Sequence, residues 1–311
     1  MLQKGDVIFL MGPTASGKTS LAMALSKQLP IEIISVDSAL VYKGLVIGAA
    51  KPTTQELLEY PHHLIDIRDV TEPYSAANFR EDAEKLIIEI LGKGKIPLLV
   101  GGTMLYFKAL LSGLADLPAA DPSVRQQLDE EAKIHGLAYM HQQLEKVDPE
   151  SAKRIHPNDP QRMLRALEVF KVSGKSLTQH REMQKTIAFP YNVIQLAIAP
   201  KERSELHQRI EARFDGMINE GFVEEVRHFW QREDVDESLP AMKSVGYRQI
   251  WQYLDGDLSF NEMQKRAVVA SRQLAKRQLT WLRSWPHVHW LDSLDQKVVD
   301  KALNLINANR M

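Results

Sequence analysis

Three largely apolar runs lie in the first hundred residues of the chain, and each is long enough to form a strand that is buried on both faces. They span residues 7–11, 31–36 and 96–100. Before the third run, apolar residues recur at helical spacing between Ser75, a good capping residue, and Gly92, a helix stop. Strands that alternate with helices predict an α/β fold with a doubly wound parallel sheet, to which 63–67 could add a strand.

The hydrophobic pattern changes after Leu117 to short helices, each with its own start signal. An aspartate that can cap a first turn repeatedly precedes a proline, which suits the first helical position. The pairs are Asp121-Pro122, Asp148-Pro149 and Asp159-Pro160. A strand pattern returns at 193–199, and a long helix is predicted over 259–284. We therefore expect a helical insertion domain over 117–190, within a core formed by 1–116 and 191–311.

The first apolar run leads into GPTASGKT, which fits the phosphate-loop pattern G-x-x-x-x-G-K-[ST] in full, and a helical pattern follows it. Such a loop lets the backbone approach phosphates, while its amides and the helix N-terminus favour negative charge. Lys18 adds a cation, and the Thr19 hydroxyl can hold Mg²⁺. The predicted site comprises Gly12, Pro13, Thr14, Ala15, Ser16, Gly17, Lys18 and Thr19. The motif predicts a P-loop NTPase-like core but does not specify the polyphosphate.

Two further polar residues follow apolar strands, Asp37 after the second run and Thr103 after the third. Ligands of open parallel sheets bind beyond the carboxyl ends of the strands, so we expect both residues to share one crevice with the phosphate loop. An ATPase or GTPase normally has a buried strand ending in Asp that positions Mg²⁺, whereas the third run ends in Gly-Gly-Thr. The loop with Asp37 therefore favours group transfer to an acceptor, with a kinase as the first interpretation.

Composition excludes several classes of protein. A formal net charge of -1 excludes a globally basic nucleic-acid-binding protein, although not a local basic face. The absence of cysteine excludes disulfides, thiolate metal sites and thiol nucleophiles, which suits a reducing cytoplasm. No apolar run approaches the roughly 18 residues of a membrane span. We expect a cytoplasmic protein that does not enter a membrane.

Local basic character occurs in two helical regions. Residues 151–190 contain eight Lys and Arg against three acids, and a row of cations follows one line of the long C-terminal helix. This row is Lys265, Arg272, Lys276 and Arg283. A solvated helix face is the alternative, although Glu262 is the only acid in that run. The five tryptophans all lie after residue 229, where helical neighbours favour core packing over base stacking.

Several longer strings resemble the tRNA dimethylallyltransferase family, also called tRNA isopentenyltransferases. They are VDSALVYKGLVIGAAKP at 36–52, VGGTMLYFKALL at 100–111, HPNDPQRMLRALEV at 156–169, SVGYRQIWQYLDG at 244–256 and QLAKRQLTWLR at 273–283. The resemblance covers nearly the whole chain, and the zinc-finger extension of eukaryotic members is absent. It implies an enzyme that transfers a dimethylallyl group from dimethylallyl diphosphate to N6 of the adenine adjacent to the anticodon in tRNA, releasing diphosphate.

The resemblance also implies roles for particular residues. Lys18 and Arg213 would stabilise the departing diphosphate, with Mg²⁺ held by Thr19 as the cofactor. Asp37 would accept the N6 proton, and Thr103 would hydrogen-bond N6 or the bridging oxygen. Position alone leaves other roles open. Asp37 could cap the turn after its strand, Thr103 could cap the next helix, and Arg213 could pair with nearby glutamates.

Segments that contact tRNA in the family match residues in both predicted domains. They are Asp37, Ser38, Ala39, Leu40, Thr103, Arg125, Gln161, Arg162, Met163, Leu164, Arg165, Lys243, Ser244, Val245, Gly246, Tyr247, Arg248, Lys276, Arg277 and Arg283. The expected partners are the tRNA anticodon arm and dimethylallyl diphosphate, bound by a monomer. Two alternatives remain, a nucleotide or small-molecule kinase and a non-catalytic RNA-binding NTPase switch.

Overall fold

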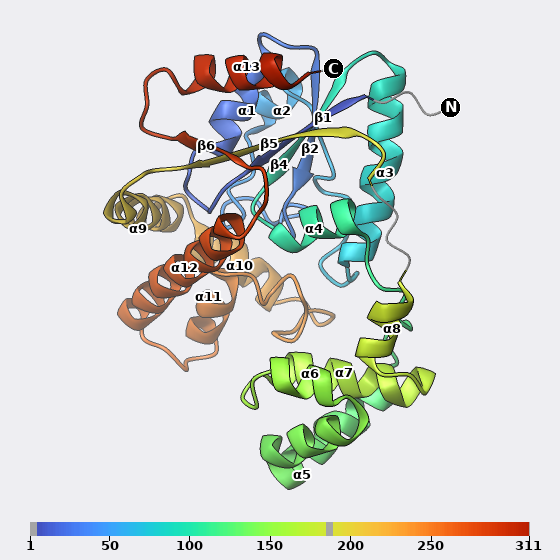
Figure 1. The fold of residues 1–311 in the computed structure, drawn as a ribbon. Helices are drawn as coiled ribbons and strands as arrows, with labels where there is room; N and C mark the ends of the chain where they lie inside the picture. The colour runs from blue at the N-terminus through green and yellow to red at the C-terminus, as the bar shows by residue number, and fades with distance from the viewer. Residues whose placement is uncertain (1–4, 185–188, 311) are drawn as a thin grey trace. The chain divides into compact units, whose positions relative to one another are not determined.

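The computed structural model describes residues 5–184 and 189–310 (Figure 1). The chain divides into two compact units. Met1–Leu111 and Phe189–Met311 form the first, here called the core unit, and Ser112–Ala188 forms the second, here called the helical unit. Lys185, one of the cations in the predicted basic insertion, lies outside the described residues.

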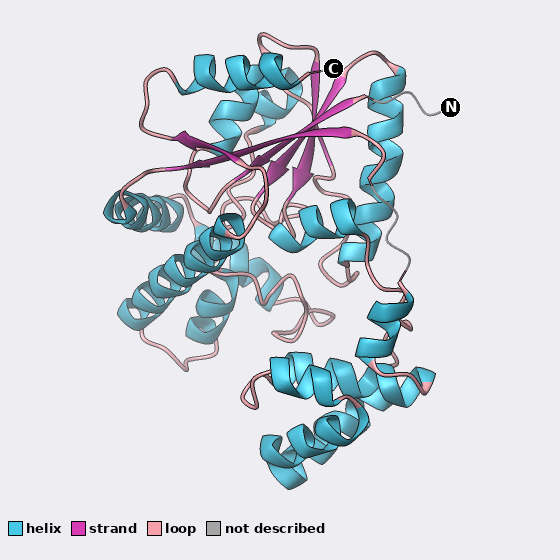
Figure 2. Cartoon of the chain, viewed as in Figure 1, coloured by secondary structure: helices cyan, strands magenta, loops and turns pink. Residues whose placement is uncertain are grey.

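A six-stranded parallel sheet in the order β3-β2-β4-β1-β5-β6 forms the centre of the core unit (Figure 2). Its strands are β1 (Asp6–Met11), β2 (Ile31–Val36), β3 (His62–His63), β4 (Ile96–Gly101), β5 (Asn192–Ala199) and β6 (His289–Asp292). The doubly wound parallel sheet is thus confirmed. The strand expected over 63–67 is present only as β3 at His62–His63, because Leu64 and Asp66 adopt φ values of 63° and 56° that extended backbone does not allow.

Helices cover both faces of this sheet, and the side chains of β1 point alternately to the two faces. Its residues Val7, Phe9 and Met11 face one hydrophobic cluster, and Ile8 and Leu10 face the other. The first face carries α3 (Ala76–Gly92) and α4 (Met104–Ser112), and the second carries α1 (Lys18–Ser26) and α13 (Val298–Asn309) (Figure 1). Burial on both faces explains why the strands read as continuous apolar runs.

Further helices of the core unit extend its first hydrophobic cluster. They are α9 (Arg203–Asn219), α10 (Phe222–Trp230), α11 (Tyr247–Leu254) and α12 (Phe260–Arg283). Helix α2 (Thr54–Glu59) has no buried residue. The long helix predicted over 259–284 is therefore confirmed as α12. It begins at a capping box in which Ser259 and Glu262 satisfy each other's backbone amides. Helix α12 packs against α9 and α11.

The helical unit consists of α5 (Pro122–Val147), α6 (Pro149–Arg154), α7 (Pro160–Ser173) and α8 (Leu177–Met183). The three predicted caps are confirmed, because Asp121, Asp148 and Asp159 each accept hydrogen bonds from first-turn amides. Helix α5 is interrupted at Gly136, whose φ of 80° lies in the left-handed region. The unit has a hydrophobic cluster of its own, centred on Met140, Leu144 and Met163.

The described residues include no helix that combines the length and apolarity needed to cross a membrane.

Candidate active site

The phosphate loop joins β1 to α1 and is held close to neighbouring backbone. A Cβ atom on Gly12 would lie 2.5 Å from the carbonyl oxygen of Ile198, so only glycine fits there. Gly17 precedes α1 with a φ of 89°, a conformation that glycine adopts without strain. Ser16 is buried, whereas Gly17 and Thr19 are exposed. The loop thus presents the exposed N-terminus of α1 to solvent, where an anion is favoured.

Strand register brings the other candidate residues to the same edge of the sheet. In the ladders, Gly101 of β4 is level with both Met11 of β1 and Val36 of β2. A Cβ atom on Gly101 would lie 1.9 Å from the Val36 carbonyl oxygen, so these strand ends touch through backbone. The residues that follow the three strands, the phosphate loop, Asp37 and Gly102-Thr103, therefore lie side by side.

Asp37 caps the turn that follows β2, which is one of the two roles that the sequence left open for it. Its Oδ1 accepts hydrogen bonds from the backbone N–H groups of Ala39, at 2.8 Å, and Leu40, at 3.4 Å. Within residues 5–184 and 189–310, Oδ2 has no hydrogen-bond donor. One carboxylate oxygen therefore orients the side chain, and the other remains able to accept a proton.

The Thr103 side chain is hydrogen-bonded to the loop after Asp37, while its backbone carbonyl accepts from Tyr106 of the helix that follows. Its Oγ1 accepts a hydrogen bond from the Ser38 N–H at 3.1 Å and donates one to Ser38 Oγ at 3.4 Å. The Thr103 N–H donates to the Val36 carbonyl at 3.2 Å. These bonds join the ends of β2 and β4 into one polar edge.

Three charged groups from separate elements interact at this edge. Burial lowers the pKa of Lys18 to about 8, Asp37 opposes that shift, and Arg213 adds to it. Burial also lowers the pKa of Arg213 below its ordinary value, again opposed by Asp37. The Lys18 Nζ donates to the Pro13 carbonyl at 2.7 Å. The cluster of two cations and one carboxylate suits an anionic ligand beside a proton acceptor.

The two arginines four residues apart on α9 have different surroundings. Arg209 Nη1 is 3.5 Å from Ser293 Oγ, after β6, while Arg213 interacts with Lys18 and Asp37. Glu211, one of the surface partners considered for Arg213, instead forms a 2.7 Å ion pair with Arg272 of α12. The geometry therefore associates Arg213 with the strand ends and leaves Arg209 outside that cluster.

The lowered pKa of Lys18 gives a testable pH dependence. Because a bound diphosphate favours the protonated amine, we expect affinity for inorganic diphosphate to be full near pH 7 and to fall as the pH rises through about 8. Titration calorimetry between pH 7 and 9.5 measures this change. Lys18→Arg is the control, since a guanidinium stays charged across that range and should remove the inflection. A flat profile for the unmodified protein would contradict the assignment.

Thr19 is the metal ligand that the sequence predicts. It is exposed at the start of α1, and its hydroxyl has no hydrogen-bond partner among the described residues. Mg²⁺ commonly takes few protein ligands and completes its octahedron with waters and substrate phosphates. One free hydroxyl beside a phosphate loop fits that donor set.

The predicted RNA-contacting residues of the core unit divide by burial. Lys243, Arg248, Lys276, Arg277 and Arg283 are exposed, whereas Gly246 and Tyr247 are buried, and Ser244 and Val245 are partly buried. The Tyr247 hydroxyl donates to Glu225 Oε1 at 2.5 Å. Burial, reinforced by that carboxylate, raises the pKa of Tyr247 far above its ordinary value. Tyr247 therefore anchors the 243–248 segment in the core and is not itself exposed to a ligand.

Glu225 is a supporting residue that the sequence did not reveal. From α10 its carboxylate also accepts backbone N–H groups of Ile47, at 2.7 Å, and of Val46 and Gly48, both at 3.2 Å. One side chain thus holds the loop after Asp37 and, through Tyr247, the 243–248 segment. No local sequence pattern predicts that Glu225 holds this loop, because its partners in the loop lie 177 to 179 residues away in sequence.

The predicted RNA-contacting residues of the helical unit also differ in surroundings. Gln161 and Arg162 are exposed, Leu164 is partly buried, and Met163 is fully buried. Arg125 and Arg165 flank Glu168, at 2.9 and 2.7 Å. Burial alone would raise the pKa of Glu168, but hydrogen bonds from Arg165, the Asp121 N–H and Arg125 hold it below its ordinary value. Arg125 therefore braces α5 against α7, while Arg165 pairs with Glu168 within α7 and donates to the Pro118 carbonyl before α5.

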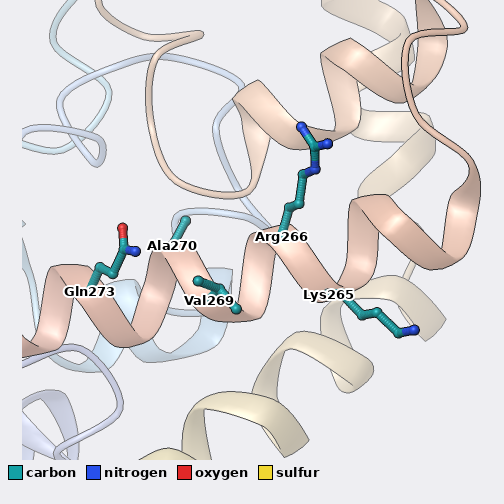
Figure 3. Close-up of a pocket in the computed structure, with 5 residues that line it drawn as sticks. All are labelled: Lys265, Arg266, Val269, Ala270 and Gln273. Atoms are coloured by element: carbon teal, nitrogen blue, oxygen red, sulfur yellow. The ribbon is translucent and has the colours of Figure 1, made fainter.

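The predicted row of cations on α12 is only partly free. Arg272 is neutralised by Glu211 of α9, while Lys265, Lys276 and Arg283 are exposed. The sequence of this helix offered Arg272 no acidic neighbour, and its partner comes from another helix. Lys265, Arg266, Val269, Ala270 and Gln273 line a shallow pocket on α12, which Figure 3 shows. None of these residues belongs to the cluster of Lys18, Asp37 and Arg213.

The expectation that the tryptophans pack in the core is wrong for most of them. Trp251 is buried and Trp285 is partly buried, but Trp230, Trp281 and Trp290 are 38%, 36% and 46% exposed. The Trp230 indole donates to Asp255 at 2.7 Å, and Lys108 Nζ stands 5.6 Å from the centre of the Trp281 ring. Trp230 and Trp281 therefore remain partly exposed, where each ring interacts with a charged side chain.

Comparison with known proteins agrees with this fold. The family model described as IPP transferase matches residues 40–285. The full-length tRNA isopentenylpyrophosphate transferase of Bacillus halodurans is 37% identical with a TM-score of 0.72, and the match covers 98% of this chain and 97% of that one. The Staphylococcus epidermidis tRNA isopentenylpyrophosphate transferase is 35% identical with a TM-score of 0.71, covering 98% and 99%. A eukaryotic dimethylallyltransferase acting on tRNA is 26% identical with a TM-score of 0.80, covering 99% of this chain and 80% of that one.

The phosphate loop at the end of β1, with a parallel sheet covered by helices, defines the chain as a P-loop-like α/β protein built for transfer chemistry. It belongs to the IPP transferase family. The family and the enzyme class expected from the sequence, a tRNA dimethylallyltransferase, are confirmed.

Proposed function

We propose that this enzyme transfers the dimethylallyl group of dimethylallyl diphosphate to N6 of the adenine adjacent to the anticodon in tRNA, and releases diphosphate. The observation that carries this proposal is the register of three strand ends, which sets a diphosphate cradle beside a carboxylate with one free oxygen. A phosphate loop alone would suit ATP. The cradle with an adjacent carboxylate suits a diphosphate that departs while an acceptor loses a proton.

In the proposed reaction the bond between N6 and the allylic carbon forms as the bond between that carbon and the diphosphate oxygen breaks. Negative charge grows on the departing diphosphate, where Lys18, Arg213 and the loop amides stabilise it. Asp37 accepts the N6 proton through Oδ2, and its charge also favours the partial positive charge of the allylic carbon. Thr103 lies beside Asp37 through Ser38 and can hydrogen-bond the acceptor amine or the bridging oxygen.

We propose Mg²⁺ as the cofactor, with Thr19 as its protein ligand. When bound, it would add positive charge on the diphosphate oxygens, as it does in other phosphate-loop enzymes. The residues of the chain supply the rest, since Lys18 and Arg213 hold the anion and Asp37 holds the proton.

A base stacked in an anticodon arm must be extruded before its N6 can reach the strand ends, at a cost of a few kcal/mol. Exposed cations can offset that cost through interactions with phosphates. We propose that Arg162 with Gln161 in the helical unit, and Lys243, Arg248 and the α12 cations in the core unit, bind the arm. Arg125 and Arg165 would contribute with the donors that Glu168 leaves free. The absence of cysteine supports action in the cytoplasm, and we propose a monomer.

One assay tests the reaction. Purified protein and Mg²⁺ are incubated with undermodified tRNA and either labelled dimethylallyl diphosphate or γ-labelled ATP. Prenyl label on the adenine adjacent to the anticodon supports the proposal. Transfer of γ-phosphate would instead identify a kinase, and binding of RNA with release of free phosphate would identify an NTPase switch. Failure of prenyl label to enter a tRNA with adenine at that position contradicts the proposal.

The exposed cations of α12 give a separate prediction. Replacing Lys276, Arg277 and Arg283 with glutamine should weaken tRNA binding and lower the slope of log affinity against log salt by about 0.7 to 0.9 for each phosphate that is no longer neutralised. Filter binding from low to moderate salt measures the slope. Replacing exposed Lys27, Lys85 and Lys301 removes the same charge from other helices and should leave the slope unchanged. Equal slopes for both variants would assign these α12 cations to an ordinary solvated face.

A further inference from the structure

Gln278 is a buried polar side chain on α12, between exposed cations, and its amide spans two loops of the candidate site. The residue is 9% exposed, whereas Lys276 and Arg277 are exposed. Its Oε1 accepts the backbone N–H of Thr14 at 2.9 Å, and its Nε2 donates to the carbonyl of Gly102, also at 2.9 Å. Only one orientation of the amide satisfies both partners, since one loop supplies a donor and the other an acceptor.

The Gln278 amide packs closely against the backbone at Gly102. A Cβ atom on Gly102 would lie 2.3 Å from the Gln278 Nε2 and 3.2 Å from the Gly12 carbonyl oxygen. The end of β4 therefore packs against the phosphate loop and against the amide at once. A side chain without polar atoms at position 278 would remove the hydrogen-bond partner of the partly buried Thr14 N–H and of the buried Gly102 carbonyl, and both losses are unfavourable.

The Gln278 amide links the two halves of the site. On one side, Thr14 belongs to the loop that carries Lys18. On the other, Gly102 precedes Thr103, which is hydrogen-bonded to Ser38 beside Asp37. These residues form a continuous chain of hydrogen bonds and peptide links from the diphosphate cradle to the proton acceptor, and every member lies in the core unit.

We propose that Gln278 is a positioning residue, which fixes the phosphate loop relative to Asp37 and Thr103 and so sets the alignment of the leaving diphosphate with the acceptor amine. The role rests on the proposed function. Gln278 touches neither substrate in this account and acts through the two loops. Loss of its hydrogen bonds would leave each half of the site able to bind its own ligand while their mutual alignment is lost. Misplacement of reacting groups by about 1 Å can cost on the order of 10²-fold in rate.

The test compares Gln278→Met, which keeps the length of the side chain but removes both hydrogen bonds, with Gln278→Ala and with Gln273→Met as the matched control. Gln273 is an exposed glutamine on the same helix. We expect kcat for prenyl transfer to fall about 10- to 100-fold in the Gln278 variants. The Kd values for inorganic diphosphate and for tRNA should stay within about twofold of the unmodified enzyme, because each half of the site remains whole. The control should keep the original kcat.

A second measurement separates positioning from a loss of folded protein. Melting temperatures are recorded, and all rates are measured well below the lowest of them, so a loss that disappears there would overturn the proposal. In an Asp37→Asn background, Gln278→Met should cost less than about threefold, because alignment with a missing proton acceptor no longer matters. A cost equal to that in the unmodified enzyme, or an unchanged kcat in both Gln278 variants, would also overturn it. If the unmodified enzyme transfers no prenyl group at all, the proposed function has failed instead.

Discussion

Asp37→Asn should lower kcat for prenyl transfer by roughly 10²- to 10⁴-fold, which is the usual contribution of a positioned general base. The substitution keeps the Oδ1 acceptor that orients the Ala39 and Leu40 amides, so the turn after β2 is preserved. It removes the second carboxylate oxygen, which is free to accept the N6 proton. Initial rates with labelled dimethylallyl diphosphate and tRNA measure the loss.

The Kd for tRNA should change by less than about twofold in the same variant, because an asparagine preserves the local backbone. Asp37→Ala is the informative comparison, since it removes the turn hydrogen bonds together with the proton acceptor and should also lower the melting temperature. If Asp37→Asn loses tRNA affinity and turnover in equal measure, Asp37 serves the structure of the loop and another group accepts the proton.

Lys18→Met should lower kcat/KM for dimethylallyl diphosphate by about 10²- to 10³-fold, the usual cost of removing one preorganised group that stabilises a developing anion. Arg213 would remain near the site but would face the diphosphate without its neighbouring cation. The affinity for tRNA should be unaffected. Steady-state kinetics with varied dimethylallyl diphosphate at saturating tRNA measure the change.

Lys27→Met is the matched control, because Lys27 is the exposed residue that ends the same helix α1. It should keep the full kcat/KM. A Lys18→Met enzyme that retains its kcat/KM would show that the phosphate loop does not hold the leaving group, and the proposed chemistry would have to be reassigned.

The elements of the core unit could largely be predicted from local pattern. Largely apolar runs identified β1, β2 and β4, because strands covered on both faces favour apolar residues on both sides of the sheet. Side-chain capping chemistry identified the starts of α3, α5, α6 and α7, because it depends on residues only two or three apart. The strand predicted over 63–67 extends no further than His63, since left-handed backbone at Leu64 and Asp66 depends on the surrounding loop.

The candidate site could be predicted in part for the same reason. Lys18, Asp37 and Thr103 directly follow strands or belong to a local motif, so the rule for parallel sheets points to each of them. No local pattern or strand-end rule points to Gln278 or Glu225, since their partners are between 22 and 264 residues away in sequence. The pairing of Arg125 with Glu168, and of Arg272 with Glu211, also depends on interactions between helices.

The sequence by itself therefore determined the phosphate loop, the parallel α/β class, the helical insertion and the family, because each follows from short-range spacing or from long matching strings. Only the tertiary structure decided that β4 lies between β1 and β2, and that Gly101 is level with both Met11 and Val36. It also decided which cations are free and which are paired. The physical reason is that strand order, register and burial arise from interactions between distant segments, which local patterns of hydrophobicity and charge do not encode.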